Sequence, residues 1–272
     1  MNFDLHTHST CSDGALSPAD LLARAVEQGV TTISITDHDT VAAYKRLPDQ
    51  AGAINIVAGI ELSTRWYATG VHIVGLNIDP RGASIRGGVD RQSNARLERA
   101  AQIGDNLARQ GMRDCFDGAL ALAEDGMIGR PHFAQHLLAA GHVDSVEMAF
   151  KKYLGDGKAG DVRQHWAELP EVISWIRDAG GIAVLAHPLK YRLTRSKLKR
   201  LLKDFIAAGG QGLEVVSGNQ LEQRTRDMGG LCREFQLLAS RGSDFHTPGA
   251  PWSELGRAPE LPHGVTPVWD AF

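Results

Sequence analysis

The sequence predicts an α/β fold in which the strands form a TIM-like parallel barrel. Short apolar runs recur along the 272 residues, and amphipathic helical segments join most of these runs. Most runs also end in polar or ligand-type residues, which matches the position of active sites at the carboxyl ends of barrel strands. A doubly wound open sheet shares the alternation of strands and helices and is the competing architecture.

Six segments have the apolar, β-branched composition of buried strands and are bounded by turn residues. They are residues 2–6, 31–39, 54–61, 181–188, 212–218 and 236–246. Most of them end in or beside histidine, aspartate or glutamate. Because helices follow these strands, we expect parallel pairing through right-handed crossovers.

The helices between these strands have recognisable boundaries and faces. Ser17 suits an N-cap, Pro18 the first helical position, and Gly29 a stop signal, so a helix is expected between them. A second amphipathic helix lies within residues 194–210, with one apolar face and one basic face. Its apolar residues are Leu198, Leu201, Leu202, Phe205 and Ile206. The basic stretch 190–203 is therefore interpreted as the solvated outer face of a barrel helix rather than as an RNA-binding surface.

The alternation of strands and helices stops between Arg86 and Glu171, where successive helical patterns follow one another. We therefore expect residues 1–85 and 172–272 to form the barrel domain. Residues 86–171 are expected to form an inserted helical cap domain over the mouth of the barrel.

Composition excludes several classes of protein. The chain has 43% hydrophobic residues and a formal net charge of -3, which gives no overall basic surface for duplex DNA. No run of 18 apolar residues and no signal peptide is evident, so a cytoplasmic protein without membrane insertion is expected. We infer no obligate protein partner. The three cysteines, Cys11, Cys115 and Cys232, form no CxxC pair and are interpreted as reduced bystanders.

Metal-ligand side chains gather at the predicted strand ends. His6 and His8 project from the same face of a strand, because side chains alternate with period two, and can hold one ion. Five of the 11 histidines lie at such ends, together with several carboxylates. The group comprises His6, His8, Asp13, His38, Glu61, His187, Asp244 and His246, with Asp37 and Asp39 flanking His38.

The donor types indicate a centre of several divalent ions. Imidazole and carboxylate without thiolate suit Mn²⁺, Zn²⁺ or Fe²⁺, and eight or more ligands are too many for one ion. We therefore predict two or three ions per chain, Mn²⁺ first, with Zn²⁺ or Fe²⁺ as alternatives. Such a centre attracts a phosphate dianion and hydrolyses phosphoesters through a water of lowered pKa. The nearby serines Ser9, Ser12 and Ser63 lack a GxSxG context and are interpreted as turn residues or as residues that support the ligands from behind.

These motifs, in this order, resemble the PHP (polymerase and histidinol phosphatase) family. The resemblance rests on HTHSTCSDG, ITDHDT, GIELS, LAHP and GSDFH, which lie between residues 4 and 246. VHIVGLNID, GRPHFAQHL and SDFHTPGAPWSELG are similar to the stand-alone bacterial branch that acts on 3',5'-nucleoside bisphosphates and related short nucleotides. The resemblance implies a distorted (β/α)7 barrel with a trinuclear centre.

The resemblance also implies a ligand set. One ion would be held by His6, His8, Glu61 and Asp244. A second would be held by Asp13, His38 and His246. Glu61 would bridge to a third, completed by His187 and His72. His72 opens an apolar strand just after the Glu61 strand and is expected there as part of its hairpin partner. Catalytic roles are carried over to Asp13, His38, Glu61 and His246.

The substrate contacts predicted by residue type and resemblance are Asp13, His38, Arg99, Arg130, His132 and His246. Arg130 and His132 lie near a helix start, where guanidinium, imidazole and backbone N–H groups bind phosphate. Arg99 is the weaker candidate, since a solvated helix arginine explains it as well. Trp252 is interpreted as packing against a core edge, with stacking on a nucleobase as the alternative.

We therefore predict a phosphatase that converts a 3',5'-nucleoside bisphosphate, such as adenosine 3',5'-bisphosphate, to the 5'-monophosphate. A 5'-to-3' exoribonuclease acting on short 5'-phosphorylated RNA would use the same residues. The motifs also allow a histidinol-phosphatase-like enzyme, an amidohydrolase-type deaminase or lactonase, or a non-catalytic PHP module.

Overall fold

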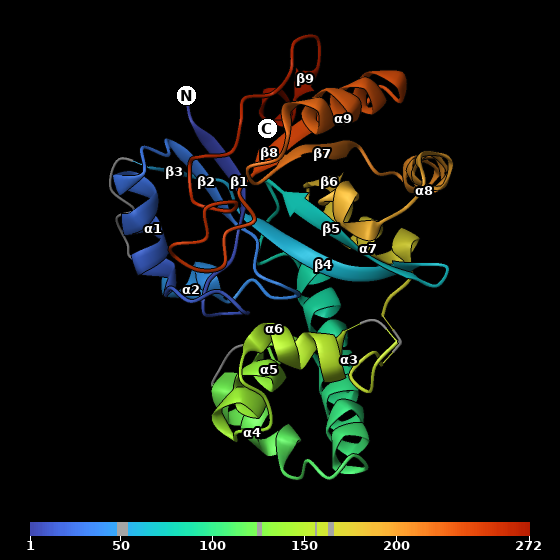
Figure 1. The fold of residues 1–272 in the computed structure, drawn as a ribbon. Coiled ribbons are helices and arrows are strands. Elements are labelled where there is room, and N and C mark those ends of the chain that lie inside the picture. Colours follow the sequence, from blue (N-terminus) through green and yellow to red (C-terminus); the bar gives the residue numbers. More distant parts are fainter. Residues whose placement is uncertain (48–53, 124–126, 156, 163–165) are drawn as a thin grey trace. The chain divides into compact units, whose positions relative to one another are not determined.

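Two sheets organise the protein, described by a computed structural model for residues 1–47, 54–123, 127–155, 157–162 and 166–272 (Figure 1). The smaller sheet has the parallel order β1-β2-β3, formed by Phe3–Thr7, Thr32–Ile35 and Asn55–Ile56. The larger has the order β4-β5-β6-β7-β8-β9. Its strands are Gly59–Trp66, Thr69–Leu76, Ile182–Leu185, Gly212–Ser217, Leu238–Gly242 and Thr266–Pro267.

The chain divides into two units, residues 1–89 with 167–272 and residues 90–166. Helices of the larger unit are α1 (Pro18–Glu27), α2 (Ala43–Arg46), α7 (Leu169–Asp178), α8 (Arg195–Ala207) and α9 (Glu222–Glu234), with short turns η2 (Pro188–Tyr191) and η3 (Val268–Ala271). The smaller unit is helical: most of α3 (Ala83–Ala108), then α4 (Cys115–Ala123), α5 (Arg130–Ala139), α6 (Val146–Ala149) and η1 (Phe150–Leu154). Residues 124–126, 156 and 163–165, within the span where successive helical patterns were expected, lie outside the described residues.

The predicted α/β class with parallel pairing is confirmed, but β5 departs from the parallel barrel and is the hairpin partner expected beside the Glu61 strand. β5 pairs antiparallel with both β4 and β6, because a short turn at Tyr67 and Ala68 joins β4 to β5 directly. The run 54–61 is also not one strand, since it divides into β3 and the start of β4. From β6 to β9 every pairing is parallel.

Isolated bridges connect the two sheets. Thr7 at the end of β1 bridges to Phe245, just after β8, and His38, just after β2, bridges to Glu61 on β4. Backbone bonds support both joins: Asp244 N–H donates to the His6 carbonyl at 2.8 Å and Asp39 N–H to the Glu61 carbonyl at 2.8 Å. The two sheets of the described residues are not one continuous closed barrel. The bridges nevertheless bring their carboxyl-terminal ends together.

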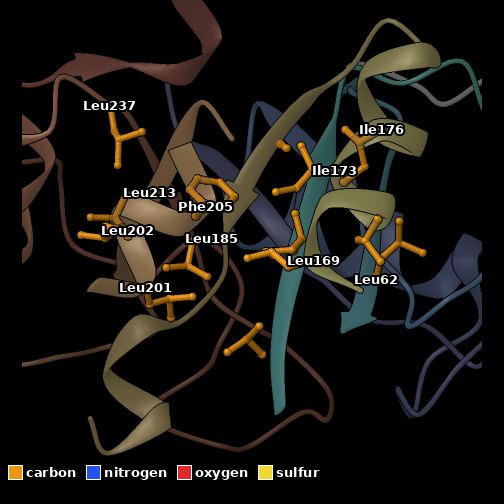
Figure 2. Close-up of a cluster of buried hydrophobic side chains, with 14 of the residues drawn as sticks. Leu62, Leu169, Ile173, Ile176, Leu185, Leu201, Leu202, Phe205, Leu213 and Leu237 are labelled. Atoms are coloured by element: carbon orange, nitrogen blue, oxygen red, sulfur yellow. The ribbon is translucent and has the colours of Figure 1, made fainter. Parts of the chain in front are cut away.

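The core of the larger unit fixes the strands that carry these ends. Figure 2 shows α7 and α8 burying apolar side chains against the sheet. α7 begins after Glu168 with a proline in its first turn, and its buried residues follow helical spacing: Leu169, Val172, Ile173 and Ile176. Each such side chain contributes about 1.5–3 kcal/mol when fully buried. The helices thereby hold the sheet in place from the face that they cover.

The predicted helices largely match the observed ones. Ser17 caps α1 by accepting from Asp20 N–H at 3.2 Å, and Gly29 has φ 75° just after it. On α8, Leu198, Leu201, Leu202 and Phe205 are buried as predicted. Ile206 was expected on the same face but is 36% exposed, because it lies at the edge of the buried stripe. No helix among the described residues has the length and apolar character needed to span a membrane.

Candidate metal centre

The nine side chains predicted as metal ligands lie together at the strand ends of the larger unit. Five of the imidazoles form a closed ring of neighbours, with centroid separations between 4.7 and 5.6 Å around the ring. In order, the ring is His6, His8, His38, His72 and His187. They come from β1, the segments after β1 and β2, β5 and the segment after β6. Residues far apart in sequence therefore converge, because the ends of β1, β2 and β6 meet beside His72 on the antiparallel strand β5.

Glu61 lies within reach of all five rings and uses its two oxygens on two different groups. Its Oε1 lies 3.0 Å from His72 Nδ1 and 2.8 Å from His187 Nε2. Its Oε2 faces the other three rings, at 3.3, 3.4 and 3.0 Å from nitrogen atoms of His6, His8 and His38. A buried carboxylate in this arrangement is suited to bridge two cations.

Asp13, Asp244 and His246 extend the cluster on the other side of His8. His246 Nε2 lies 3.4 Å from Asp13 Oδ1, and its ring stacks on His8 at 4.2 Å between centroids. Asp244 Oδ1 lies 3.3 Å from His8 Nε2 and 3.6 Å from His6 Nε2. Asp244 faces the same imidazole nitrogens of His6 and His8 as Glu61 does, whereas Asp13 faces the opposite nitrogens, His8 Nδ1 and His38 Nε2, at 3.9 and 3.8 Å. The side chains therefore supply more than one set of donors.

Buried atoms without hydrogen bonds show that the centre fits metal ions. His6 Nε2 and Glu61 Oε2 are buried 3.3 Å apart, and neither has a hydrogen-bond partner among the described residues. Buried polar atoms are normally satisfied, and a cation between them would satisfy both. Ligand atoms within 4.8 Å of one another form three groups: His8 with Asp13, His38 and His246; His6 with His8 and Glu61; and His38 with Glu61 and His72.

Burial and neighbouring charges set the protonation states of Glu61, His8 and His246. Burial would raise the pKa of Glu61, but His38 and His6 outweigh it and hold this pKa well below the usual value. Burial, with His246 and His38, lowers the pKa of His8 to about 3. At neutral pH Glu61 is therefore an anion and His8 a neutral imidazole, as metal ligation requires. Burial alone would lower the pKa of His246, but Asp13 and Asp244 outweigh it and raise this pKa to about 9.

Glu214 on β7 is a residue that sequence reasoning missed. Its Oε1 lies 2.9 Å from His6 Nδ1, and its Oε2 accepts from the His187 backbone N–H at 2.5 Å. A carboxylate at Nδ1 keeps the ring proton on that nitrogen. The lone pair of Nε2, which faces the centre, is then free to bind a metal ion. A glutamate within the apolar run GLEVV was the available signal, since a buried strand rarely carries an unpaired carboxylate.

The aspartates on either side of His38 hold the backbone instead of facing the centre. Asp37 accepts from the Ser9 N–H at 2.7 Å and from the Ser9 and Ser12 hydroxyls at 2.6 Å each. Asp39 accepts from the Ser63 N–H at 2.7 Å and its hydroxyl at 2.8 Å. Ser9 and Ser12 lie in the turn after β1, whereas Ser63 lies within β4, and all three serines support the segments around His38 through these aspartates. The two aspartates thereby fix the loop that presents His38.

Asp4 also has a structural role, although it lies beside the ligands in sequence. It accepts from the N–H groups of Ser243 at 2.7 Å and Gly256 at 3.1 Å, which anchors the segment carrying Asp244. Asp244 and His187 have φ values of 55° and 25°, an uncommon conformation for residues with a Cβ atom. Such backbone strain is concentrated at functional sites.

The substrate contacts predicted at Arg99, Arg130 and His132 lie in the smaller unit. Arg130 opens α5 and donates to the Leu154 carbonyl at 3.2 Å. His132 is buried and its Nδ1 accepts from the Gly129 N–H at 3.0 Å, so Nε2 carries the ring proton. Arg99 lies over the ring of Trp166 at 5.7 Å, beside Arg96 at 5.3 Å. These contacts orient the basic side chains within the unit, and their role in substrate binding stays a prediction.

Trp252 and a cavity beside α9 are two further features of the larger unit. Trp252 is 67% exposed, so the interpretation that it packs against a core edge is wrong. Its backbone carbonyl accepts a hydrogen bond from the Asn219 N–H at 2.6 Å. A cavity of about 470 Å³ lies beside α9, lined by residues such as Arg226, Pro262 and His263. Because it contains none of the clustered ligands, we place the active site at the strand ends.

Known proteins resemble the chain over almost all of its length. A protein from Haemophilus influenzae named 5'-3' exoribonuclease is 42% identical over 99% of this chain and 98% of its own. A protein from Chromobacterium violaceum named 3',5'-nucleoside bisphosphate phosphatase is 41% identical, over 98% and 95%. The solved structure of an amidohydrolase from Chromobacterium violaceum, with bound sulfate, has a TM-score of 0.90 and 40% identity, covering 100% of this chain and 95% of that one.

The model of the PHP domain matches residues 4–182, which include most of the clustered ligands. Together with the similarity to these relatives, the match shows that the chain belongs to the PHP domain family.

Proposed function

We propose that this protein is a metal-dependent phosphatase that removes the 3'-phosphate from 3',5'-nucleoside bisphosphates. The observation that carries the proposal is the buried carboxylate of Glu61, whose two oxygens face two groups of imidazoles. Clusters of this type hold two or more divalent ions, and phosphoester hydrolysis is the chemistry that such centres perform. The name of the 41% identical relative supports the nucleotide substrate.

The metal content is part of the proposal. We propose two or three ions, Mn²⁺ first, with His6, His8, Glu61 and Asp244 around one of them. Asp13, His38 and His246 would hold a second, and the three groups of close ligand atoms support more than one ion. Glu61 would bridge to a third set that includes His72 and His187. The contacts of both histidines with Oε1 of Glu61 support this assignment.

The chain's own residues would position the reaction. When bound, the ions would lower the pKa of a water and offset the charge of the phosphate. Glu61 would fix the spacing between the ligand sets. Asp13, His38 and His246, less buried than His6 and His8, would line the place where the phosphoryl group enters. Glu214 would keep the His6 ring in the orientation that binds metal.

We propose that the substrate's second phosphate is bound by Arg99, Arg130 and His132. Guanidinium groups bind phosphate through paired N–H donors, and Nε2–H of His132 adds another donor. Stacking of the Arg99 guanidinium over Trp166 supports an oriented donor. The strand ends of the larger unit would form the mouth of a distorted seven-stranded barrel. The bridges between β1 and the end of β8, and between residues 38 and 61, support that barrel.

A comparison of substrates tests the proposal. We expect the Mn²⁺-loaded protein to release phosphate from adenosine 3',5'-bisphosphate at least tenfold faster than it degrades a 5'-phosphorylated RNA tetramer. Histidinol phosphate serves as the non-nucleotide control. Turnover of the RNA alone would replace the proposal by 5'-to-3' exoribonuclease activity, the name of the 42% identical relative. Turnover of histidinol phosphate alone would reject both nucleotide functions.

A further inference from the structure

A short turn after β6 carries two side chains toward the metal centre. The 3-10 turn η2 spans Pro188–Tyr191, and the residues on either side of it, His187 and Arg192, have φ values of 25° and 51°. Residues with a Cβ atom adopt such values at a cost, and they persist only where surrounding contacts fix them. The turn is therefore held in a particular shape.

Tyr191 supplies the contacts that hold the turn. Its hydroxyl donates to the Ala186 carbonyl at 2.8 Å and accepts from the His72 backbone N–H at 3.0 Å. Its ring lies edge-on to the His187 ring at 5.5 Å. The turn is thus fixed to both β5 and β6, next to two candidate ligands. The residue before Tyr191 is consequently presented in a defined direction.

That residue is Lys190, which was expected on the outer face of a barrel helix but instead contacts the centre. Its Nζ donates to Asp244 Oδ2, while Oδ1 of the same carboxylate faces His6 and His8. The Lys190 side chain is 58% exposed, whereas that of Asp244 is 5% exposed. The ammonium group therefore lies at the rim, in contact with the buried ligands on one side and open to solvent on the other.

We infer that Lys190 binds the phosphoryl group that is hydrolysed at the metal centre. A lysine ammonium has three donors, so one can remain on Asp244 Oδ2 while others meet phosphate oxygens. Its position beside Asp244 places a fixed positive charge next to a site built from imidazoles and carboxylates. The inference rests on the proposed function, because it requires a phosphorylated substrate at this centre.

Substitution of Lys190 by methionine, which keeps an unbranched side chain of similar length and removes its charge, tests the inference. We expect Lys190→Met to weaken binding of inorganic phosphate to the Mn²⁺-loaded protein by about tenfold to a hundredfold, as lost charged hydrogen bonds do. The metal content should stay unchanged, and Lys190→Arg should restore part of the affinity. Lys199→Met is the matched control, because Lys199 pairs with Glu234 on the surface.

Two measurements separate the possible failures. If Lys190→Met loses metal while the remaining loaded protein binds phosphate normally, Lys190 only positions Asp244 and the inference is overturned. Phosphate affinity equal to that of the wild type would also overturn it. If the wild type binds phosphate but cleaves no nucleotide, the proposed substrate fails while the Lys190 contact can still be measured.

Discussion

The buried carboxylate of Glu214 shows how single residues prepare the metal centre. The ligand types could be predicted from the sequence, because histidines and carboxylates at strand ends have a recognisable pattern. The direction of each side chain could not be predicted. Asp37 and His38 are neighbours in sequence, but hydrogen bonds with Ser9 and Ser12 turn the Asp37 carboxylate away from the centre. Glu214 is distant in sequence from His6, so its contact depends on tertiary structure.

Loss of the Glu214 carboxylate should weaken metal binding. Glutamine can accept only one of the two bonds that Glu214 accepts from His6 and the His187 backbone. We expect Glu214→Gln to reduce Mn²⁺ affinity by about tenfold to a hundredfold, measured by titration calorimetry. Glu222→Gln is the control, because Glu222 is exposed on α9. Equal Mn²⁺ affinity in the two variants would contradict the role of Glu214.

Metal binding should release protons near neutral pH. The pKa of His246 in the metal-free chain is raised to about 9, so this imidazole is protonated at pH 7 and must lose its proton to bind an ion. We expect Mn²⁺ affinity to rise as the pH rises from 6.5 toward 9. Calorimetry in two buffers of different ionisation enthalpy measures the proton release. An affinity independent of pH in the wild type would show that His246 is not a ligand.

At the scale of elements, strand identity was easier to predict than strand direction. The apolar runs identified most of the β-forming segments, since buried strands have a continuous apolar composition, but the two-residue strand β9 was not among them. β5 runs antiparallel to β4 because a short turn joins the two strands. Its antiparallel pairing with β6 depends on which strand lies beside it in the folded chain. Close approach of β8 to β1 is also a tertiary property. A Cβ atom at Gly242 would lie 2.3 Å from the Cβ of His6.

Enlarging Gly242 should therefore disturb the strand that carries His6 and His8. We expect Gly242→Ala to lower the free energy of unfolding by about 1–3 kcal/mol, as overpacking does, and to lower metal content. Gly230→Ala on α9 is the control, because nothing lies within 4 Å of the added atom and alanine favours helix. Denaturant unfolding with metal analysis measures both. A Gly242→Ala protein as stable and as metal-rich as the control would contradict this packing.

At the scale of the whole molecule, the predicted metal ligands lie at the strand ends of the larger unit, and the basic residues predicted to bind phosphate lie in the helical unit. The interruption of the strand rhythm was visible in the sequence because the span contains successive helical patterns. The function of this helical span was not visible in the sequence, because arginines on helices are commonly solvated. In the smaller unit Arg99 and Arg96 lie over Trp166, a contact that neither sequence spacing nor composition indicates.

The smaller unit should affect substrate binding without affecting metal content. We expect Arg130→Ala to raise KM for adenosine 3',5'-bisphosphate about tenfold or more, because a charged hydrogen bond to phosphate is lost. Thermal stability and bound metal should match those of Arg109→Ala, a surface control just after α3. Steady-state kinetics with metal analysis provides the test. An unchanged KM would remove Arg130 from the substrate site.

The central claim is that the cluster around Glu61 is a metal centre for phosphoester hydrolysis. Chelator-treated protein, assayed for phosphate release from adenosine 3',5'-bisphosphate before and after Mn²⁺ is restored, tests it most directly. We predict loss of activity on chelation and full recovery with Mn²⁺, but no recovery in Glu61→Ala. Undiminished activity in protein shown to be free of metal, or normal recovery in Glu61→Ala, would contradict the claim.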